Sequence, residues 1–419
     1  MTNERRTHLL SLAVIALLGL TALSWFEGTH SAVAGYDFAT SLNPLDDLKR
    51  SVYLWDERLY AGAPNILGTG TMPYFLLQYL AECATGSLYR GEMVFFALLF
   101  TLPGLTMYML LRTMNSGGAE SGAVSFFGAL FYMFNTFVVV KWNRGELITL
   151  FSYGSLPLFL TLVERGLKGP LTVRFLVFFI CSMFFFPGTL GHSADFLIVT
   201  GIIGAFASWR VAANLSPAVL KRAALLLLTA TLSSAWWAMP LLSAVKGGGA
   251  GITSFTTNEL DMVNYYSKWA SLLNIMKLWF SPMYETSVEF GTQFYRPGTL
   301  LFPLIGFSAL LFRRDSTVLF FSALALAGLW LSKGTSPPAP WVYEWMYRHI
   351  PYFFIFRAPS RYFPLIYTLS LAVLIGYSTG FASAGVKMIT KKSSLRLVPG
   401  AVVAALIFFS SWPLFSRTT

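Results

Sequence analysis

Long runs of apolar residues alternate with short polar loops along almost the whole chain. About eleven of these runs are long enough to cross a bilayer core of about 30 Å as helices. They lie at residues 8–26, 92–112, 121–140, 147–163, 173–190, 194–209, 222–245, 297–312, 316–332, 361–383 and 397–415. The pattern therefore predicts an all-α polytopic membrane protein, in which residues 1–419 form a single transmembrane domain.

Two segments need separate interpretation. Residues 69–85 are amphipathic, with proline, glutamine and glutamate inside the run, so we expect an interfacial or re-entrant piece there. The first run, 8–26, could instead be a cleavable signal peptide, because residues 32–34 read Ala-Val-Ala, the form of a cleavage site. Its length exceeds the usual apolar region of about 7–15 residues in such peptides, which favours an uncleaved anchor.

Basic residues gather in the short loops between the apolar runs. With eleven spans these loops all fall on one side of the membrane, with Arg5, Arg6, Arg165, Lys168, Arg174, Arg210, Lys221, Arg222, Arg313, Arg314, Lys387, Lys391, Lys392 and Arg396. Cytoplasmic loops are enriched in lysine and arginine. We therefore expect a multi-pass protein of the plasma (inner) membrane with a cytoplasmic N-terminus and an outer C-terminus.

Composition excludes a soluble enzyme. Hydrophobic residues make up 55% of the 419 residues and charged residues only 12%, with a mean hydropathy of +0.60, whereas soluble domains carry about 25% charged residues. The formal net charge is +11, which in a soluble protein would suggest nucleic acid. Because the cytoplasmic loops account for all of this excess, we expect no nucleic-acid partner.

No nucleotide-binding or hydrolase motif interrupts the pattern. Walker A, Rossmann, HExxH and GxSxG sequences are absent, and the cytoplasmic loops are short, so we expect chemistry on the outer face. Three outer segments are long, at 27–91, 246–296 and 333–360, and they contain interfacial-helix patterns such as residues 264–280. Long loops in a compact protein are usually functional. No internal repeat is evident, which disfavours an inverted-repeat transporter.

The first outer loop is the most polar part of the chain. Asp37 follows the first span by about ten residues and stands between Tyr36 and Phe38. Apolar surroundings raise the pKa of a carboxyl group, which suits a general base. A solvated loop aspartate explains the position equally well. Asp46 and Asp47 follow an Asn-Pro pair, so we interpret them as acids at a helix start rather than as catalysts.

Other polar residues lie in outer turns. They are Asp56 and Glu57 in the first loop, Lys141, Arg144 and Glu146 in KWNRGE, and His192 and Asp195 in FPGTLGHSADF. For KWNRGE, a solvated turn between two helices is slightly favoured over a phosphate contact. A polar pair such as His192 and Asp195 between two spans is often functional. A single histidine is weak support for a metal site, which needs more ligands.

Arg357 and Arg361 stand four residues apart just before a span, with Pro359 between them. The proline makes a regular helix doubtful at this point. Arginines at a membrane interface can be snorkelling anchors. On the outer side, however, two neighbouring arginines are an exception to the positive-inside rule. Arginine also binds phosphate with bidentate geometry. A lipid-linked phosphate is the natural anion at that depth.

Several stretches together resemble the GT-C superfamily of membrane glycosyltransferases. They are YDFATSLNPLDDLKRSVYLWDERLYAG, RGELITLFSYGSLPLFL and PYFFIFRAPSRYFPL. Their order is similar to that in the mycobacterial α-(1→3)-arabinofuranosyltransferase D and YfhO-like branch, and the likeness covers the whole membrane region. The long C-terminal part of that branch, which carries carbohydrate-binding modules, has no counterpart within these 419 residues.

The resemblance implies an activity and partners. It implies transfer of a sugar, arabinofuranose in that branch, from a polyprenyl-phosphate donor to a cell-envelope glycan or glycolipid acceptor at the extracytoplasmic face. By position, Asp37 matches the catalytic base, and Arg357 and Arg361 match a segment that we interpret as the donor-phosphate contact. Candidate substrate contacts without a matched family role are Asp56, Arg144 and His192. The sequence has no metal ligand set, although some family members use a divalent cation, so a cofactor stays open.

Two other functions remain to be weighed. A transporter or flippase of a lipid-linked saccharide would explain the spans, but it predicts charged residues near the middle of several helices. The interiors of the expected spans are almost free of charge, which favours chemistry at the surface. An assembly partner without enzymatic activity would need no aligned set of polar residues.

Overall fold

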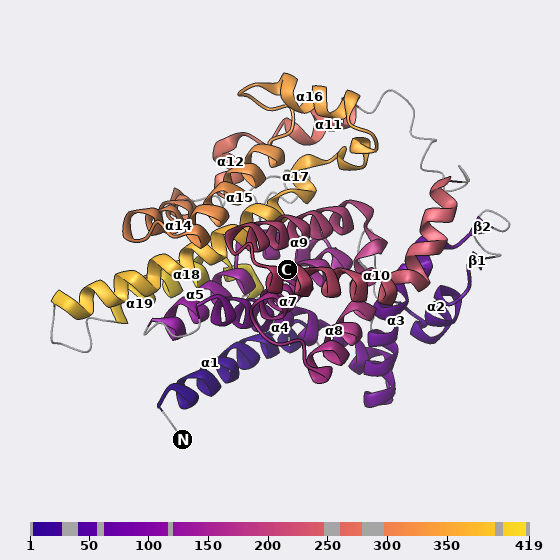
Figure 1. Cartoon of the computed structure of the whole chain (residues 1–419), viewed down its shortest axis with the longest axis horizontal. Coiled ribbons are helices and arrows are strands. Elements are labelled where there is room, and N and C mark those ends of the chain that lie inside the picture. The colour runs from indigo at the N-terminus through magenta and orange to yellow at the C-terminus, as the bar shows by residue number, and fades with distance from the viewer. Residues whose placement is uncertain are drawn as a thin grey trace. The chain divides into compact units, whose positions relative to one another are not determined.

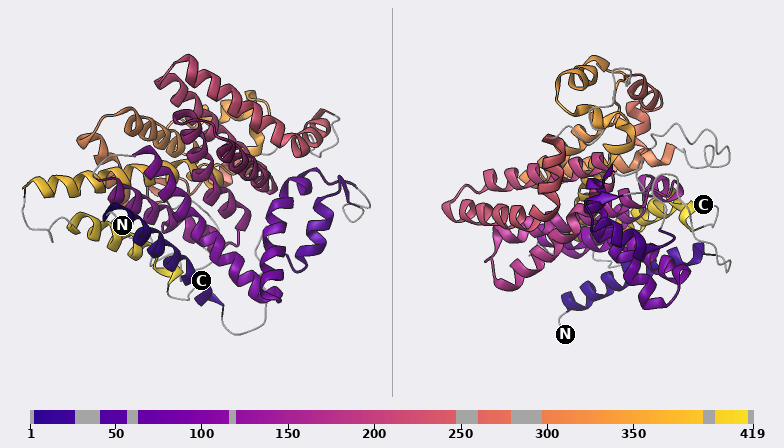
Figure 2. Two further views of the ribbon diagram at one scale, coloured as in Figure 1. Left: turned by 60° about the horizontal axis from the view of Figure 1, so that its bottom comes forward. Right: turned by 90° about the vertical axis from the view of Figure 1, so that its right-hand side faces the viewer.

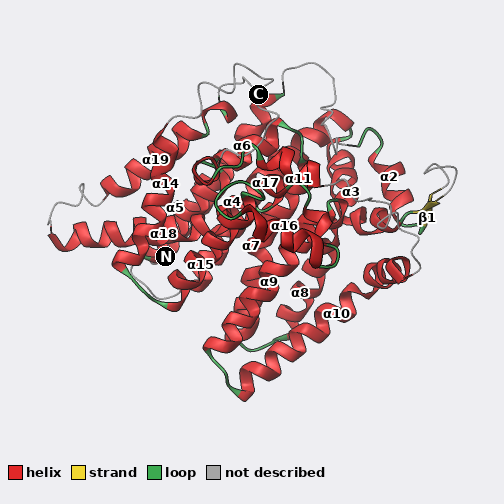
Figure 3. Ribbon diagram, turned by 90° about the horizontal axis from the view of Figure 1, so that it is seen from above, coloured by secondary structure: helices red, strands yellow, loops and turns green. Residues whose placement is uncertain are grey.

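A computed structural model describes residues 3–26, 41–56, 63–115, 120–246, 260–278, 297–389 and 397–415. Within these ranges the chain is almost entirely helical (Figure 3). The described strands are two residues long: β1 (Trp55–Asp56) pairs antiparallel with β2 (Ala63–Pro64). The expected all-α class is therefore confirmed.

The apolar runs form helices where the sequence predicts spans. Eight helices of the described chain are long and apolar enough to cross a membrane, and they cover Arg5–Trp25, Leu88–Met114, Ser121–Trp142, Leu147–Lys168, Val173–Gly191, Ser193–Ala213, Pro217–Ser243 and Pro359–Val386. Three further apolar helices, Gly298–Phe312, Ser316–Ser332 and Val398–Ser410, are shorter. All eleven predicted segments thus coincide with a helix, which confirms the polytopic membrane architecture.

Contacts divide the chain into two compact units. Unit 1 comprises Met1–Leu18, Pro103–Val140 and Thr257–Thr419, and unit 2 comprises Gly19–Leu102 and Lys141–Thr256. Figure 1 labels the elements of both units along the chain. The boundaries fall inside helices: α1 (Asn3–Gly19), α4 (Leu88–Met114) and α6 (Thr136–Asn143) each contribute to both units. That residues 1–419 form one domain stays a prediction.

Unit 1 is built around α18. Its helices are α5 (Ser121–Met133), α11 (Leu260–Ser267), α12 (Leu272–Met276), η4 (Pro297–Leu300), α14 (Leu301–Phe312), α15 (Ser316–Ser332), α16 (Pro340–His349), η5 (Phe353–Phe356), α17 (Pro359–Tyr362), α18 (Pro364–Ile389), α19 (Val398–Ser410) and η7 (Trp412–Leu414), with parts of α1, α4 and α6. The central α18 packs against α5, α14, α15 and α19. A Cβ on Gly376 would lie 2.5 Å from the carbonyl oxygen of Val124, so a glycine is needed where α18 and α5 approach each other. Small residues allow such close packing of membrane helices.

Unit 2 packs its helices around α7. They are η1 (Leu20–Trp25), α2 (Pro44–Ser51), α3 (Ile66–Thr85), α7 (Leu147–Lys168), α8 (Val173–Phe185), η2 (Phe186–Gly191), α9 (Ser193–Ala213) and α10 (Pro217–Lys246), with the first half of α4. Helices α8, α9 and η2 contact α7, as does α10, and α10 runs beside α8 and α9 (Figure 2). α3 packs against η2 and α10, so the amphipathic segment predicted at 69–85 is a helix whose N-terminal half covers η2.

The helix start predicted near Asp46 is confirmed. Pro44 occupies the first turn of α2, and the side chain of Asn43 accepts a hydrogen bond from the backbone N–H of Asp46 at 3.2 Å. Asp46 and Asp47 lie in the first turn, where the helix dipole favours acids. The Asp46 carboxylate also pairs with Arg50 at 2.8 Å. These contacts give both acids a structural explanation.

The interfacial-helix pattern at 264–280 is helical in the part that the structure describes, which ends at residue 278. Two short helices, α11 and α12, form there, separated by a turn at residues 268–271. Ser271 ends the turn, since its hydroxyl accepts from the backbone N–H of Asn274 at 3.3 Å. A serine cap competes with helix continuation and starts a new helix. α16 does form as an amphipathic helix, with Tyr343 buried and Trp341 and Trp345 exposed.

Candidate functional site

A tight turn between α6 and α7 gathers three charged side chains in unit 2. Gly145 adopts a φ of +63°, a left-handed conformation that favours glycine, and the N–H of Glu146 donates to the carbonyl of Lys141 at 3.0 Å. The Glu146 carboxylate is held between two cations, with Lys141 Nζ at 2.5 Å and Arg144 Nε at 2.9 Å. The sequence KWNRGE thus folds into a local ion-pair network.

A second carboxylate lies at the start of α9. The Thr149 hydroxyl, one turn into α7, donates to Asp195 Oδ2 at 2.5 Å. The His192 ring lies beside the same oxygen, with Nδ1 at 3.2 Å. The ammonium of Lys141 also interacts electrostatically with Asp195. Glu146 directly precedes α7 and Thr149 lies in the first turn of α7, so both carboxylates lie at the start of this helix. We call the two groups together the buried polar cluster, defined as Lys141, Arg144, Glu146, Thr149, His192 and Asp195.

Burial distinguishes the members of the cluster. The side chains of Lys141, Glu146 and Asp195 are 1%, 2% and 0% exposed, whereas Arg144 and His192 keep 9% and 13% of their side-chain surface exposed. The interpretation of KWNRGE as a solvated turn is therefore wrong. The two side chains that can reach a ligand are Arg144 and His192, which the sequence also singles out.

Stability alone is a weak explanation for this cluster. Burying charges costs several kcal/mol for each ion, and buried ion pairs often contribute little net stability. The Oδ1 atom of Asp195 is buried without a hydrogen-bond partner among the described residues. Concentrations of buried charge with an accessible edge are typical of functional sites. We therefore treat the buried polar cluster as the candidate functional site.

Aromatic rings flank the cluster on the side of α4. Trp142, between Lys141 and Arg144 in sequence, packs edge-on against Trp25 with 5.1 Å between ring centroids. It also contacts Phe96 and Phe100 at 5.1 and 5.7 Å. These contacts hold the end of α6 against α4 and η1, and they exclude water from one side of the charged turn.

Two residues that the sequence predicts for the site cannot be placed with it. Asp37 lies outside the described residues. Asp56 lies in β1, where the structure describes the backbone and not its side chain. Their proposed roles as base and as substrate contact therefore stay predictions.

Arg357 and Arg361 belong to unit 1. Arg357 lies two residues before α17, Arg361 lies within it, and both are half-buried. Pro359 starts α17 rather than interrupting a regular helix. Two hydrogen bonds fix this segment: the Tyr343 hydroxyl donates to the carbonyl of Phe356 at 2.7 Å, and the Ser360 hydroxyl donates to that of Tyr266 at 3.0 Å. The arginines thus come from an ordered segment, as a binding role requires.

Lys333 is a buried cation at the end of α15 that the sequence analysis missed. Its ammonium donates to the carbonyls of Ser336 and Gly334 at 2.7 and 3.2 Å and lies over the ring of Trp330. The side chain is 1% exposed. Burial lowers the pKa of this ammonium. A lysine directly after an apolar helix is the only sequence signal for it, and that signal also fits a snorkelling side chain.

The lowered pKa of Lys333 predicts a pH effect on stability. The unfolded chain binds this proton more tightly than the folded one, so folding should be favoured as pH rises toward the ordinary lysine value of about 10.4. Wild type should gain stability relative to Lys333→Met between neutral pH and that value. Unfolding midpoints of both proteins in the same detergent, measured across this range, check the prediction. A difference that stays constant with pH would contradict it.

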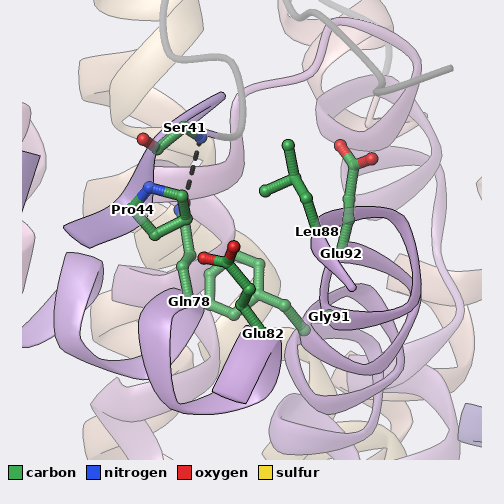
Figure 4. A pocket seen from close by; sticks show the side chains of 8 residues that line it. Ser41, Pro44, Gln78, Glu82, Leu88, Gly91 and Glu92 are labelled. Carbon is green, nitrogen blue, oxygen red and sulfur yellow. Dashed lines mark hydrogen bonds between the residues drawn. The ribbon is translucent and has the colours of Figure 1, made fainter. Parts of the chain in front are cut away.

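A small pocket opens in unit 2 between α2, α3 and α4 (Figure 4). It is lined by Ser41, Pro44, Gln78, Glu82, Leu88, Gly91, Glu92 and Phe95. The Gln78 side chain accepts from the N–H of Ser41 at 3.0 Å, which ties the start of α2 to α3. In Figure 4 the Leu88 side chain lies between the carboxylates of Glu82 and Glu92, so the two acids do not converge.

No metal site is visible in the part of the chain that the structure describes. Within it, no three His, Cys, Asp or Glu side chains form a group that could hold an ion. The buried polar cluster also contains two permanent cations beside its acids, which disfavours a metal there.

The fold is shared with a known glycosyltransferase. A cryo-EM structure of the arabinofuranosyltransferase AftD from Mycobacteria is similar with a TM-score of 0.62 and 13% sequence identity, and the likeness covers 96% of this chain. The same likeness covers 27% of the AftD chain, so this chain spans about a quarter of its length. No protein-family model and no curated protein matches the sequence. The expected GT-C-like fold is confirmed, whereas the particular branch stays a prediction.

Proposed function

We propose that this chain is a GT-C-type glycosyltransferase that moves a sugar from a polyprenyl-phosphate donor to a cell-envelope glycan or lipid acceptor. The observation that supports it most is the fold shared with an arabinofuranosyltransferase over 96% of the chain. The same likeness makes arabinofuranose our first choice of sugar and favours the arabinofuranosyltransferase D branch.

The proposed reaction is a single displacement. Asp37 removes the proton from an acceptor hydroxyl while that oxygen attacks the anomeric carbon of the donor sugar. The bond between this carbon and the phosphate oxygen breaks, and its electron pair leaves with polyprenyl phosphate. Because attack and departure occur on opposite faces, the anomeric configuration inverts. Phosphate is a good leaving group, so a strong general acid is less needed than in glycoside hydrolysis.

The negative charge that develops on the leaving phosphate needs cations. We assign this role to Arg357 and Arg361, whose guanidinium groups match phosphate in geometry. Arg144 and His192 are the accessible side chains of the buried polar cluster and are assigned as substrate contacts. Its buried acids act as positioning residues, since Glu146 contacts Arg144 and Asp195 contacts His192. Lys141 holds the Glu146 carboxylate from the other side.

The arginine assignment predicts a defect in donor binding. Arg357→Gln and Arg361→Gln should each raise the donor KM by about tenfold to a hundredfold, the range for a lost hydrogen bond to a charged group. Arg348→Gln is the matched control, because Arg348 is exposed on α16 of the same segment and should leave KM unchanged. Initial rates against donor concentration check the prediction. If all three variants have the same KM for the donor, the assignment of both arginines to the phosphate site is wrong.

The arrangement of turns in unit 2 supports an extracytoplasmic site. α7 and α9 both begin at the buried polar cluster, and their last turns carry Arg165, Lys168 and Arg210. By the positive-inside rule the basic end faces the cytoplasm. The cluster then faces outward, in a multi-pass protein of the plasma (inner) membrane whose N-terminus is cytoplasmic.

A transporter or flippase of a lipid-linked saccharide is the second candidate function. The charges buried at the α6–α7 turn favour it, because charged groups at helix ends can line a substrate path. Vesicles that contain the purified chain and a fluorescent polyprenyl-phospho-sugar separate the two functions. Movement of intact donor between leaflets without cleavage would support the flippase, and release of polyprenyl phosphate would support the enzyme.

A further inference from the structure

The end of unit 2 away from the buried polar cluster carries cations almost alone. This basic end consists of the last turn of α7, the first turn of α8, the last turn of α9 and the first two turns of α10. Its cations are Arg165, Lys168, Arg174, Arg210, Lys221 and Arg222, and Glu164 is the one acid in residues 164–174 and 210–222, all of which are described. The surface therefore has a strong positive charge.

The single acid of the basic end is already neutralised. Glu164 is 1% exposed. Arg210 donates two hydrogen bonds to its carboxylate, from Nε to Oε2 at 2.6 Å and from Nη2 to Oε1. Lys168 Nζ lies 2.7 Å from the same carboxylate. Arg210 also lies over the ring of Trp209, with 4.3 Å to its centroid. Arg210 is therefore rigidly placed, and the surrounding cations have no exposed acid beside them.

Arg222 joins α10 to the end of α7. Its Nη1 donates to the carbonyls of Leu167 and Lys168 at 2.9 and 3.3 Å, where the helix dipole favours a cation. These bonds leave Nη2 and Nε of Arg222, and Nη1 of Arg210, without a hydrogen bond among the described residues. Two fixed guanidinium groups thus keep donors available at the basic end.

Apolar side chains are exposed beside these cations. Val173 is 77% exposed, Leu215 72% and Leu220 48%. Val173 and Leu220 directly precede Arg174 and Lys221 in sequence, and Leu215 lies in the loop between α9 and α10. A free inorganic anion or a nucleic acid would gain nothing from exposed aliphatic groups, whereas a lipid presents a phosphate and a hydrocarbon chain at neighbouring depths.

We propose that the basic end binds the headgroup of an anionic phospholipid. Arg174, Lys221 and the remaining donors of Arg210 and Arg222 contact the phosphate, while Val173, Leu215 and Leu220 contact the upper part of the acyl chains. This lipid is distinct from the donor and acceptor of the proposed reaction, since it lies at the other end of α7 and α9. The proposal needs no assumption about sugar transfer.

Native mass spectrometry of the full chain in mixed micelles tests the proposal. Phosphatidylglycerol and phosphatidylcholine with the same acyl chains compete for the protein, and the retained lipids are counted. Wild type should retain phosphatidylglycerol preferentially, and salt should reduce this preference because it screens exposed charges. Equal retention of the two lipids by wild type would overturn the proposal.

Matched variants locate the site. Arg174→Gln with Lys221→Gln removes two exposed cations whose side chains make no hydrogen bond or ion pair among the described residues. It should lower the preference about thirtyfold, or about fivefold for each cation. Lys49→Gln with Arg90→Gln removes two exposed cations elsewhere in unit 2 and should keep the wild-type preference. An equal loss in both pairs would overturn the assignment to the basic end.

The source of the phosphate is tested separately. Inorganic phosphate added without lipid should leave the unfolding temperature unchanged, whereas phosphatidylglycerol should raise it above the value in phosphatidylcholine, since a ligand that binds the folded state stabilises it. If inorganic phosphate raises the unfolding temperature as much as phosphatidylglycerol does, the basic end binds a free anion and the lipid proposal is wrong.

Discussion

Replacing Asp37 by asparagine should lower the kcat of sugar transfer by about 10³-fold, within the range of about 10²–10⁴ that general acid–base catalysis contributes. Asparagine keeps the shape of the side chain and cannot accept the proton of the acceptor hydroxyl. Donor KM should change little, because the proposed base does not contact the phosphate. Steady-state rates with a labelled polyprenyl-phospho-sugar measure both constants.

Neighbouring acids provide the control for this prediction. Asp46→Asn changes a carboxylate nine residues further along the chain, which the structure places in the first turn of α2, paired with Arg50. It should leave kcat unchanged. Asp37→Glu retains a carboxylate and should recover part of the activity. Wild-type transfer by Asp37→Asn would show that another group takes the proton.

The second large effect concerns stability. Glu146→Ala should lower the free energy of unfolding by about 3–5 kcal/mol, the cost of removing one partner from a buried ion pair. The change leaves Lys141, 1% exposed, and Arg144, 9% exposed, without the carboxylate that both contact. Unfolding by a denaturing detergent in mixed micelles measures the loss.

An exposed ion pair serves as the matched control. Asp46→Ala breaks the pair with Arg50, in which both side chains are about one-third exposed at 34% and 35%. Exposed pairs contribute about 0–1 kcal/mol, so the loss should stay below about 1 kcal/mol. If Glu146→Ala costs no more than Asp46→Ala, the charged turn is solvated in the working protein and the account of the buried polar cluster fails.

The membrane helices were predictable because length and apolarity determine them. Residues 147–163 contain no charge, and α7 forms there and extends to Lys168. The end of a helix depends on local caps that are harder to anticipate. At 264–280 the apolar and aromatic pattern indicates interfacial helix but does not show that a turn at residues 268–271 divides it. The Ser271 hydroxyl caps the start of the second helix, α12.

The candidate site was only partly predictable. The sequence places Lys141, Arg144 and Glu146 in one turn, but it does not show that they are buried. α4 and η1 come from distant parts of the chain and pack against Trp142 in this turn. Thr149 and Asp195 are 46 residues apart and meet only because α7 and α9 lie side by side. Thr149 is missed for this reason, as a threonine inside an apolar run fits a helix interior equally well.

The central claim is that the chain cleaves a lipid-linked sugar and passes it on. The most direct measurement is a single turnover of the purified protein with a polyprenyl-phospho-arabinofuranose labelled in the sugar, together with a glycan acceptor. The account predicts that the label appears in the acceptor with inverted anomeric configuration, in step with release of polyprenyl phosphate. Donor that stays intact with wild-type protein, including donor that only changes leaflet, would contradict it.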